Sequence, residues 1–142
     1  MEHEHAIKQI EQALENIGGF AKLVGGLQVV RIEEESKKVH FTFVVEEKHT
    51  NTFGFLHGGV IAYLIDVCGS LAITIHGSAL GVSTDISVSY LKGTRVGQTV
   101  NIEAEAPKVG GSLAFSTVRL WVDGEVIAYG NHTKFVAQKS KL

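Results

Sequence analysis

The longest apolar stretch of the chain, residues 60–75, places the strongest constraint on the fold. Apolar residues occupy nearly every side of the helix that this stretch would form, and such a helix must be buried by the rest of the protein. Asp66 is the only charged residue within it. A buried carboxylate costs several kcal/mol unless it is paired or protonated, and such groups gather at functional sites. The sequence therefore predicts a buried helix that carries a candidate functional carboxylate.

A membrane span and an ordinary core helix are the two alternative interpretations of this stretch. A membrane span needs about 20 predominantly apolar residues, and Asp66, Ser70 and the flanking His57 and His76 argue against one. An ordinary core helix in which Asp66 has no function is the stronger of the two alternatives.

The residues His57-Gly58-Gly59 mark the point where the buried helix should begin. The first N–H groups of a helix have no partner inside it, and the helix dipole is positive at that end. A bare helix N-terminus can stabilise a developing oxyanion, and a nearby carboxylate can activate water. Together these features suggest acyl chemistry.

Length and composition set broad limits. A chain of 142 residues fits a single domain over 1–142 that can bury a core. A net charge of −2 and a pI of about 6.4 do not favour a nucleic-acid partner. The single cysteine, Cys68, lies inside the apolar stretch and is predicted to be a small buried hydrophobe. No secretory or transit pattern begins the chain, so we expect a cytoplasmic protein, with mitochondrial association left open. The histidine spacing predicts no metal site.

Periodicity divides the rest of the chain into helices and strands. Residues 1–19 are assigned to an N-terminal helix, and the central helix is predicted over 58–76. Asp123-Gly124 is a strong hairpin signal. The predicted fold class is α+β, a curved antiparallel sheet of five or six strands, with one solvated face, wrapped around one long helix. The predicted strands are 27–32, 39–45, 81–91, 99–107, 113–122 and 125–136.

The spacing of His57 and Asp66 limits how the two residues can act together. Nine residues along a helix change direction by about 180° and advance by about 13 Å. One chain can hardly bring both side chains to one small reacting group. Either a two-fold dimer builds each site from His57 and Gly58 of one copy and Asp66 of the other, or only one of them is catalytic.

A wider set of motifs resembles a known family over roughly Val29 to Phe135. The motifs, in chain order, are Asn51, Gly54, Leu56-His57-Gly58-Gly59, Leu64-Ile65-Asp66, Gly81-Val82-Ser83-Thr84-Asp85, Ser89-Tyr90-Leu91, Leu113-Ala114-Phe115 and Gly130-Asn131-His132-Thr133-Lys134. Together they resemble the hotdog-fold acyl-CoA thioesterases of the phenylacetic-acid-degradation type.

This resemblance implies a hotdog fold, a homotetramer built as a dimer of dimers, and a role in lipid metabolism that needs no cofactor. The implied substrate is a medium-chain, long-chain or aryl acyl-CoA. The implied catalytic residues have distinct roles. The Gly58 N–H would hold the thioester oxygen, and Asp66 would be the general base or the nucleophile. Asn51 and His57 would orient the carbonyl and the water, and Ser83 would help to place them.

The resemblance also implies CoA contacts along two segments. These comprise Tyr90, Leu91, Lys92, Gly93, Thr94 and Arg95, and then Lys108, Val109, Gly110, Gly111, Ser112 and Leu113. The family's Ser-Pro-Ala-like turn is replaced here by Gly93-Thr94-Arg95, and Gly111 stands where a basic residue is expected. Lys92, Arg95 and Lys108 remain able to neutralise phosphates.

Two other functions stay open at this point. A hydratase or dehydratase on the same fold also needs a His and an acid near a thioester, although the arrangement of Asn51, His57 and Asp66 resembles the hydrolases better. A non-catalytic acyl-CoA-binding module would use Asp66 only as a satisfied polar group. Ser70 lacks the surroundings of a nucleophile elbow, and His132 is assigned a structural or surface role.

Overall fold

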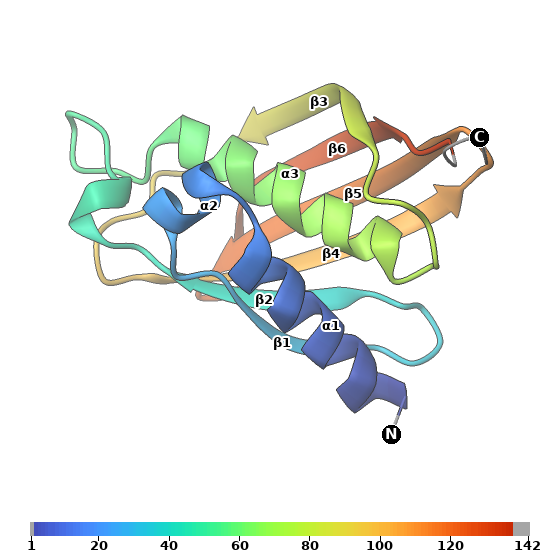
Figure 1. Cartoon of the computed structure of the whole chain (residues 1–142). Coiled ribbons are helices and arrows are strands. Elements are labelled where there is room, and N and C mark those ends of the chain that lie inside the picture. The colour runs from blue at the N-terminus through green and yellow to red at the C-terminus, as the bar shows by residue number, and fades with distance from the viewer. Residues whose placement is uncertain (1, 138–142) are drawn as a thin grey trace.

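The computed structural model describes residues 2–137 (Figure 1). A six-stranded antiparallel sheet curves around one long helix, α3 (Gly58–Thr74), which confirms the predicted architecture. The strands are β1 (Gln28–Ile32), β2 (Val39–Val44), β3 (Val82–Tyr90), β4 (Thr99–Val109), β5 (Leu113–Val122) and β6 (Glu125–Phe135). Their order across the sheet is β1-β2-β4-β5-β6-β3, so that β1 and β3 are the edge strands.

Glycines let α3 lie close to the sheet. A Cβ atom at Gly69 on α3 would collide with the Ser116 hydroxyl on β5. A Cβ atom at Gly130 on β6 would lie 2.9 Å from the Ile65 side chain. Because neither position carries a side chain, helix and strands approach closely, and α3 side chains such as Leu64 are fully buried between them.

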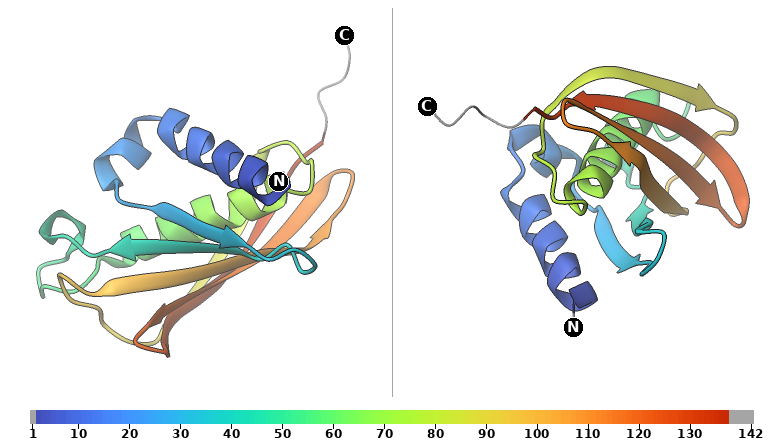
Figure 2. Two further views of the ribbon diagram at one scale, coloured as in Figure 1. Left: turned by 90° about the horizontal axis from the view of Figure 1, so that it is seen from below. Right: turned by 90° about the vertical axis from the view of Figure 1, so that its right-hand side faces the viewer.

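The N-terminal segment forms two helices where the sequence predicted one. Helix α1 (Glu2–Asn16) lies on the same side of the sheet as α3 (Figure 2). A short helix, α2 (Gly19–Val24), follows, and its Phe20 ring meets the Tyr63 ring edge-on at a centroid distance of 5.3 Å. A 3-10 turn, η1 (Glu47–His49), precedes α3, which ends at Thr74, two residues before its predicted end.

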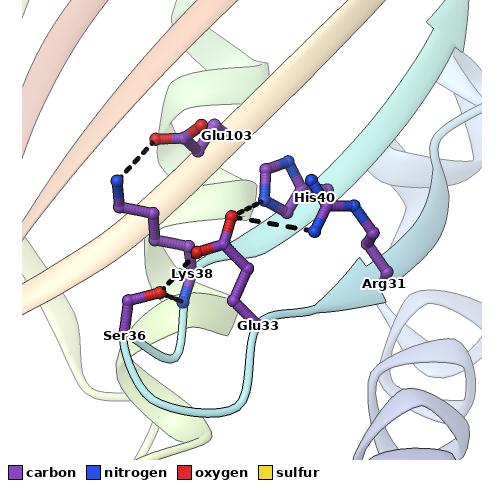
Figure 3. A network of polar contacts seen from close by, with 6 residues as sticks. All are labelled: Arg31, Glu33, Ser36, Lys38, His40 and Glu103. Atoms are coloured by element: carbon purple, nitrogen blue, oxygen red, sulfur yellow. Dashed lines mark hydrogen bonds and ion pairs between the residues drawn. The ribbon is translucent and has the colours of Figure 1, made fainter.

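A polar network holds the β1–β2 hairpin together (Figure 3). The Glu33 carboxylate accepts a hydrogen bond from Ser36 Oγ at 2.7 Å and lies 2.8 Å from His40 Nε2. These two contacts lower the pKa of Glu33. Lys38 reaches across to Glu103 on β4 at 3.3 Å. The network therefore stabilises the edge of the sheet opposite β3.

A bulge near the start of β3 determines where Ser83 lies. Ser83 pairs with Lys134 of β6 and Asp85 pairs with Thr133, so that Thr84 is an extra residue in the strand. In a strand without a bulge, Ser83 and Ile86 would point to opposite faces of the sheet. The bulge instead brings Ser83 to the α3 side of the sheet.

Candidate functional site

Five polar side chains meet where the middle of α3 faces β6 and the start of β3. We call them the α3–β6 cluster: Asp66, Ser70, Ser83, His132 and Lys134. His132 Nε2 lies 2.7 Å from Ser83 Oγ and 3.8 Å from Asp66 Oδ1. Ser70 Oγ donates to Asp66 Oδ1 at 3.4 Å and accepts from Lys134 Nζ at 2.8 Å. The cluster therefore surrounds one carboxylate with two hydroxyl groups and two basic groups.

His132 is almost fully buried, with 1 % of its surface exposed. Burial lowers the pKa of this imidazole, and the nearby Asp66 carboxylate opposes part of that shift. Within the described part of the chain its Nδ1 atom has no hydrogen-bond partner, whereas Nε2 faces Ser83 and Asp66. The arrangement favours the neutral tautomer with the proton on Nε2, which donates to Ser83 Oγ. The Ser83 hydroxyl then keeps its own proton to donate to a ligand.

Asp66 is less buried than the sequence predicted. Its side chain is 45 % exposed, because it lies beside β6 and also lines a cavity of about 400 Å³. The cavity is mostly apolar, and its charged groups, Asp66 and Lys134, come from the α3–β6 cluster. Its remaining walls are formed by Ile17, Gly18, Gly19, Phe20 and Ala21 at the α1–α2 junction and by Tyr63, Val67 and Leu80. It can hold an apolar group beside a carboxylate.

A second group of predicted site residues lies at the start of α3. His57 is the N-cap of the helix, and its Nδ1 accepts a hydrogen bond from the Gly59 N–H at 2.8 Å. The Tyr90 hydroxyl donates to the Gly58 carbonyl at 3.0 Å. The Gly58 N–H is among the first donors of α3, which have no partner inside the helix. This end of α3 therefore presents donors that can stabilise an anionic oxygen.

Asn51 shapes the loop that leads into α3. Its Oδ1 atom accepts hydrogen bonds from the N–H groups of Phe53 and Phe55 at 2.9 and 3.1 Å. These two bonds occupy the side-chain oxygen, and the amide nitrogen remains as a donor. Asn51 therefore has a structural role, and within residues 2–137 its amide nitrogen donates no hydrogen bond.

The two groups are separated along α3 within one chain. Gly58 and Asp66 are eight residues apart, which corresponds to about 12 Å along the helix axis. The structure brings Asp66 together with Ser83, and it places Asn51 in the loop before His57. As the sequence spacing predicted, a single chain does not bring Asp66 and Ser83 to the same small reacting group as Asn51 and His57.

The two predicted CoA segments lie at opposite ends of the sheet. The first segment, Tyr90–Arg95, begins at the last residue of β3. Its Arg95 pairs with Phe55, next to the start of α3. Lys108–Leu113 forms the β4–β5 turn beside Phe135, which also pairs with Val82 at the start of β3. A single chain therefore presents them far apart along the sheet.

The predicted phosphate partners have different surroundings. Lys92 Nζ already lies 2.6 Å from the Glu125 carboxylate. The Arg95 guanidinium lies 4.4 Å from the centroid of the Phe55 ring, in a cation–π arrangement. Lys108 is exposed at the end of β4. Arg95 and Lys108 are therefore better placed than Lys92 to meet a phosphate.

Of the two roles assigned to His132, structural or surface, the surface role was wrong, and Ser70, which was rejected only as a nucleophile, lies in the cluster. His132 and Lys134 both face inward, and both are buried. Their spacing contained a usable signal, because they continue the inward-facing series of Gly130 on β6, and two basic residues on a buried strand face need partners. Ser70 is likewise one helical turn after Asp66.

Three further sequence predictions concern a metal site, a membrane span and Cys68. Among residues 2–137, no three His, Cys, Asp or Glu side chains come together in a group that could hold a metal ion. No helix in that range is long and apolar enough to cross a bilayer. Cys68 is buried, and its burial raises the pKa of the thiol well above the usual value, in agreement with its prediction as a hydrophobe.

Comparison with known proteins identifies the family. The sequence profile of the Thioesterase superfamily matches residues 53–129, from the loop before α3 into β6. Acyl-coenzyme A thioesterase 13 of Homo sapiens is 33% identical over 132 residues, which cover 91% of this chain and 93% of that protein.

Solved structures agree with this match. Zebra fish thioesterase superfamily member 2 has a TM-score of 0.81 at 36% identity, covering 92% of this chain and 96% of that one. The protein smu.793 from Streptococcus mutans UA159, solved bound to acetyl CoA, has a TM-score of 0.75 at 28% identity, with coverages of 89% and 97%. The predicted hotdog fold and the predicted resemblance are both confirmed, and the chain belongs to the thioesterase superfamily.

Proposed function

We propose that this protein hydrolyses medium-chain, long-chain or aryl acyl-CoA to the free acid and CoA, within lipid metabolism. The observation that carries the proposal is the position of Asp66. Its carboxylate is contacted by Ser70, lies close to His132 and faces a mostly apolar cavity of about 400 Å³. Thioester hydrolysis needs a base for the attacking water and an apolar place for the acyl group. No cofactor enters this scheme.

Asp66 acts as the general base in this scheme. Ser83, which accepts the His132 hydrogen bond, uses its own proton to position the water or the thioester beside Asp66. The carboxylate removes a proton from water as the oxygen bonds to the carbonyl carbon. The C–S bond then breaks, and the CoA thiolate leaves and takes up a proton. Attack by the carboxylate itself, through an anhydride, is the alternative that the same position allows.

The developing oxyanion requires a donor, and the Gly58 N–H supplies it, with Asn51 and His57 orienting the carbonyl. One well-aimed donor of this kind is worth about 3 kcal/mol. Because Gly58 and Asp66 are separated along α3, the complete site takes Gly58 from one copy of the chain and Asp66 from another.

The edge strand β3 offers a way to join the two copies. Antiparallel pairing of two β3 strands about a two-fold axis can bring Ser83 of one copy opposite Tyr90 of the other. Tyr90 contacts Gly58, so this pairing brings the start of one α3 toward the α3–β6 cluster of the other copy. It also brings Tyr90–Arg95 and Lys108–Leu113 toward the same end of the joined sheet, where both can contact one CoA.

The outer face of the sheet supports a homotetramer built as a dimer of dimers. The sequence predicted a solvated face, but several large apolar side chains are exposed there, and the register places Leu113 and Val82 on either side of Phe135. Apolar patches of this kind mark association surfaces. The exposed apolar residues are Val82, Leu113, Phe115, Tyr129 and Phe135.

The first test measures thiol release from acyl-CoA thioesters that range from acetyl-CoA to palmitoyl-CoA and phenylacetyl-CoA. Asp66→Asn keeps the side-chain volume and removes the base, so kcat should fall by about 10² to 10⁴ while the thermal transition is preserved. Asp123→Asn is the matched control, because it removes an exposed carboxylate in the β5–β6 turn, away from the α3–β6 cluster, and should change kcat by less than about threefold.

Two outcomes would contradict the proposal. An Asp66→Asn protein that kept more than about a tenth of kcat would remove Asp66 as the base. Tight binding of acyl-CoA without thiol release would favour the binding-module alternative, and hydration of an unsaturated acyl-CoA would favour the hydratase.

A further inference from the structure

The proposed chemistry makes no use of the ammonium group of Lys134. Lys134 is 4 % exposed, and its Nζ atom donates a hydrogen bond to Ser70 Oγ at 2.8 Å. Removing an ammonium group from water costs several kcal/mol, and an apolar side chain of similar volume is often more stabilising at such a position. A contribution to stability therefore does not account for a lysine here.

Ser70 connects Lys134 to Asp66. Its hydroxyl accepts from Lys134 Nζ and donates to Asp66 Oδ1 at 3.4 Å, while His132 Nε2 approaches the same oxygen at 3.8 Å. Oδ1 is thus approached from two sides. Among the described residues, no hydrogen bond reaches Oδ2, which leaves this oxygen to accept a proton from water.

Lys134 differs in charge from the other ionisable groups around Asp66. Tyr63 and Cys68 on α3 stay neutral, because burial raises the pKa of Tyr63 to about 12 and that of Cys68 well above its usual value. Burial also lowers the pKa of His132 and so favours its neutral form, and Asp85 on β3 adds negative charge. The α1–α2 junction contributes no ionisable group to the cavity wall. Among the described residues that line the cavity or belong to the cluster, Lys134 therefore supplies the positive charge.

We propose that Lys134 is a positioning residue for the reaction, which orients the Asp66 carboxylate through Ser70. This inference rests on the proposed hydrolysis. It assigns Lys134 and Ser70 one shared role: neither touches the reacting atoms, and both act through Asp66. Burial lowers the pKa of Lys134, and Asp66 opposes part of that shift.

The test compares kcat, KM and the thermal transition of variants. Lys134→Met keeps the length and removes the hydrogen-bond donor, so kcat should fall on the order of tenfold with a smaller change in KM, because orientation is lost and binding is not. Lys134→Arg keeps a charged donor to Ser70 and should restore most of kcat. The matched control is Lys8→Met on the exposed face of α1, which should change neither quantity.

Ser70→Ala covers the case in which Lys134→Met does not fold. It should lower kcat with a smaller change in KM, because it removes the hydroxyl that joins Lys134 to Asp66. A folded Lys134→Met protein with wild-type kcat, or a Ser70→Ala protein with wild-type kcat, would overturn the inference. In either case hydrolysis by the wild-type protein would stand. Absence of wild-type thiol release would instead refute the proposed function together with this inference.

Discussion

Burial determines the charge of the basic residues in the α3–β6 cluster, and His132 is the clearest example. Desolvation lowers its pKa from 6.5, and Asp66 compensates only in part. A neutral ring at this position can donate from Nε2 to Ser83 and keep the serine oriented. The cluster therefore depends on a histidine that does not carry charge at neutral pH.

Replacement of His132 by Gln should reduce the acid sensitivity of folding. Because the pKa of His132 in the folded state lies below 6.5, its stabilising contribution is present above that pH and is lost as the pH falls from 6.5 through the lowered value. Gln keeps an N–H donor but cannot titrate in this range. Urea unfolding at pH 7.5 and at pH 5.5 should show a larger loss of free energy for the wild type than for His132→Gln. His5→Gln, on exposed α1, is the control, and equal losses in all three proteins would contradict this account.

At the scale of elements, the β3 bulge is the feature that completes the cluster. It lets Ser83 face α3, where His132 can reach it. Gly81, just before β3, has a φ of 66°, and a Cβ atom there would collide with the Phe135 carbonyl oxygen. The start of β3 is therefore held by a glycine that no other residue can replace without movement of the strand.

Gly81→Ala should cost more than its backbone strain alone. Gly77 is the matched control, because its φ is 80° and a Cβ atom there meets nothing within 4 Å. We expect Gly77→Ala to cost about 1 kcal/mol and to leave kcat unchanged. Gly81→Ala should cost about 2 kcal/mol or more and lower kcat as Ser83 moves. Denaturant unfolding and thiol release on both variants provide the measurement, and equal effects would show that the bulge does not depend on Gly81.

The elements also show which parts of the structure periodicity can predict. The six strands and α3 were predicted because each has an apolar pattern that only one secondary structure can bury. The second helix, α2, was not predicted, because two adjacent glycines, Gly18 and Gly19, are typical of a helix end and not of a helix start. Ser83 was associated with the site by resemblance, but its inward position depends on a bulge, which inserts one residue and leaves no mark on the alternation. Asp66 was expected to be buried because the sequence cannot show which side of a helix the sheet leaves uncovered.

At the scale of the whole molecule, the proposed shared site predicts that two differently mutated copies of the chain complement each other. Asn51→Asp keeps the Oδ1 acceptor of the loop and removes the amide donor, while Asp66→Asn removes the base. Each variant alone should be nearly inactive. When the two are unfolded and refolded together, half of the dimers are mixed, and one of the two sites in each mixed dimer has both wild-type residues. We expect about a quarter of wild-type activity to return.

The control refolds each variant separately and then mixes the products without exchange, which should restore nothing. Mass spectrometry of the intact oligomer verifies that subunits have exchanged. Exchange without recovery of activity would show that Asn51 and Asp66 of the same chain serve one site, and the shared site would have to be abandoned.

The α1–α2 junction, which forms one wall of the cavity, has a consequence for how this protein can diverge in evolution. Gly18 and Gly19 line the cavity, neither has a positive φ, and a Cβ atom at either position meets nothing within 4 Å. Both positions lie at the α1–α2 junction, apart from every residue of the α3–β6 cluster. Substitutions at Gly18 or Gly19 can therefore place progressively larger side chains in the cavity at little cost in stability. Under the proposed function the cavity holds the acyl group, so descendants of this chain can change their acyl preference by substitutions at the α1–α2 junction, while the α3–β6 cluster stays under unchanged selection.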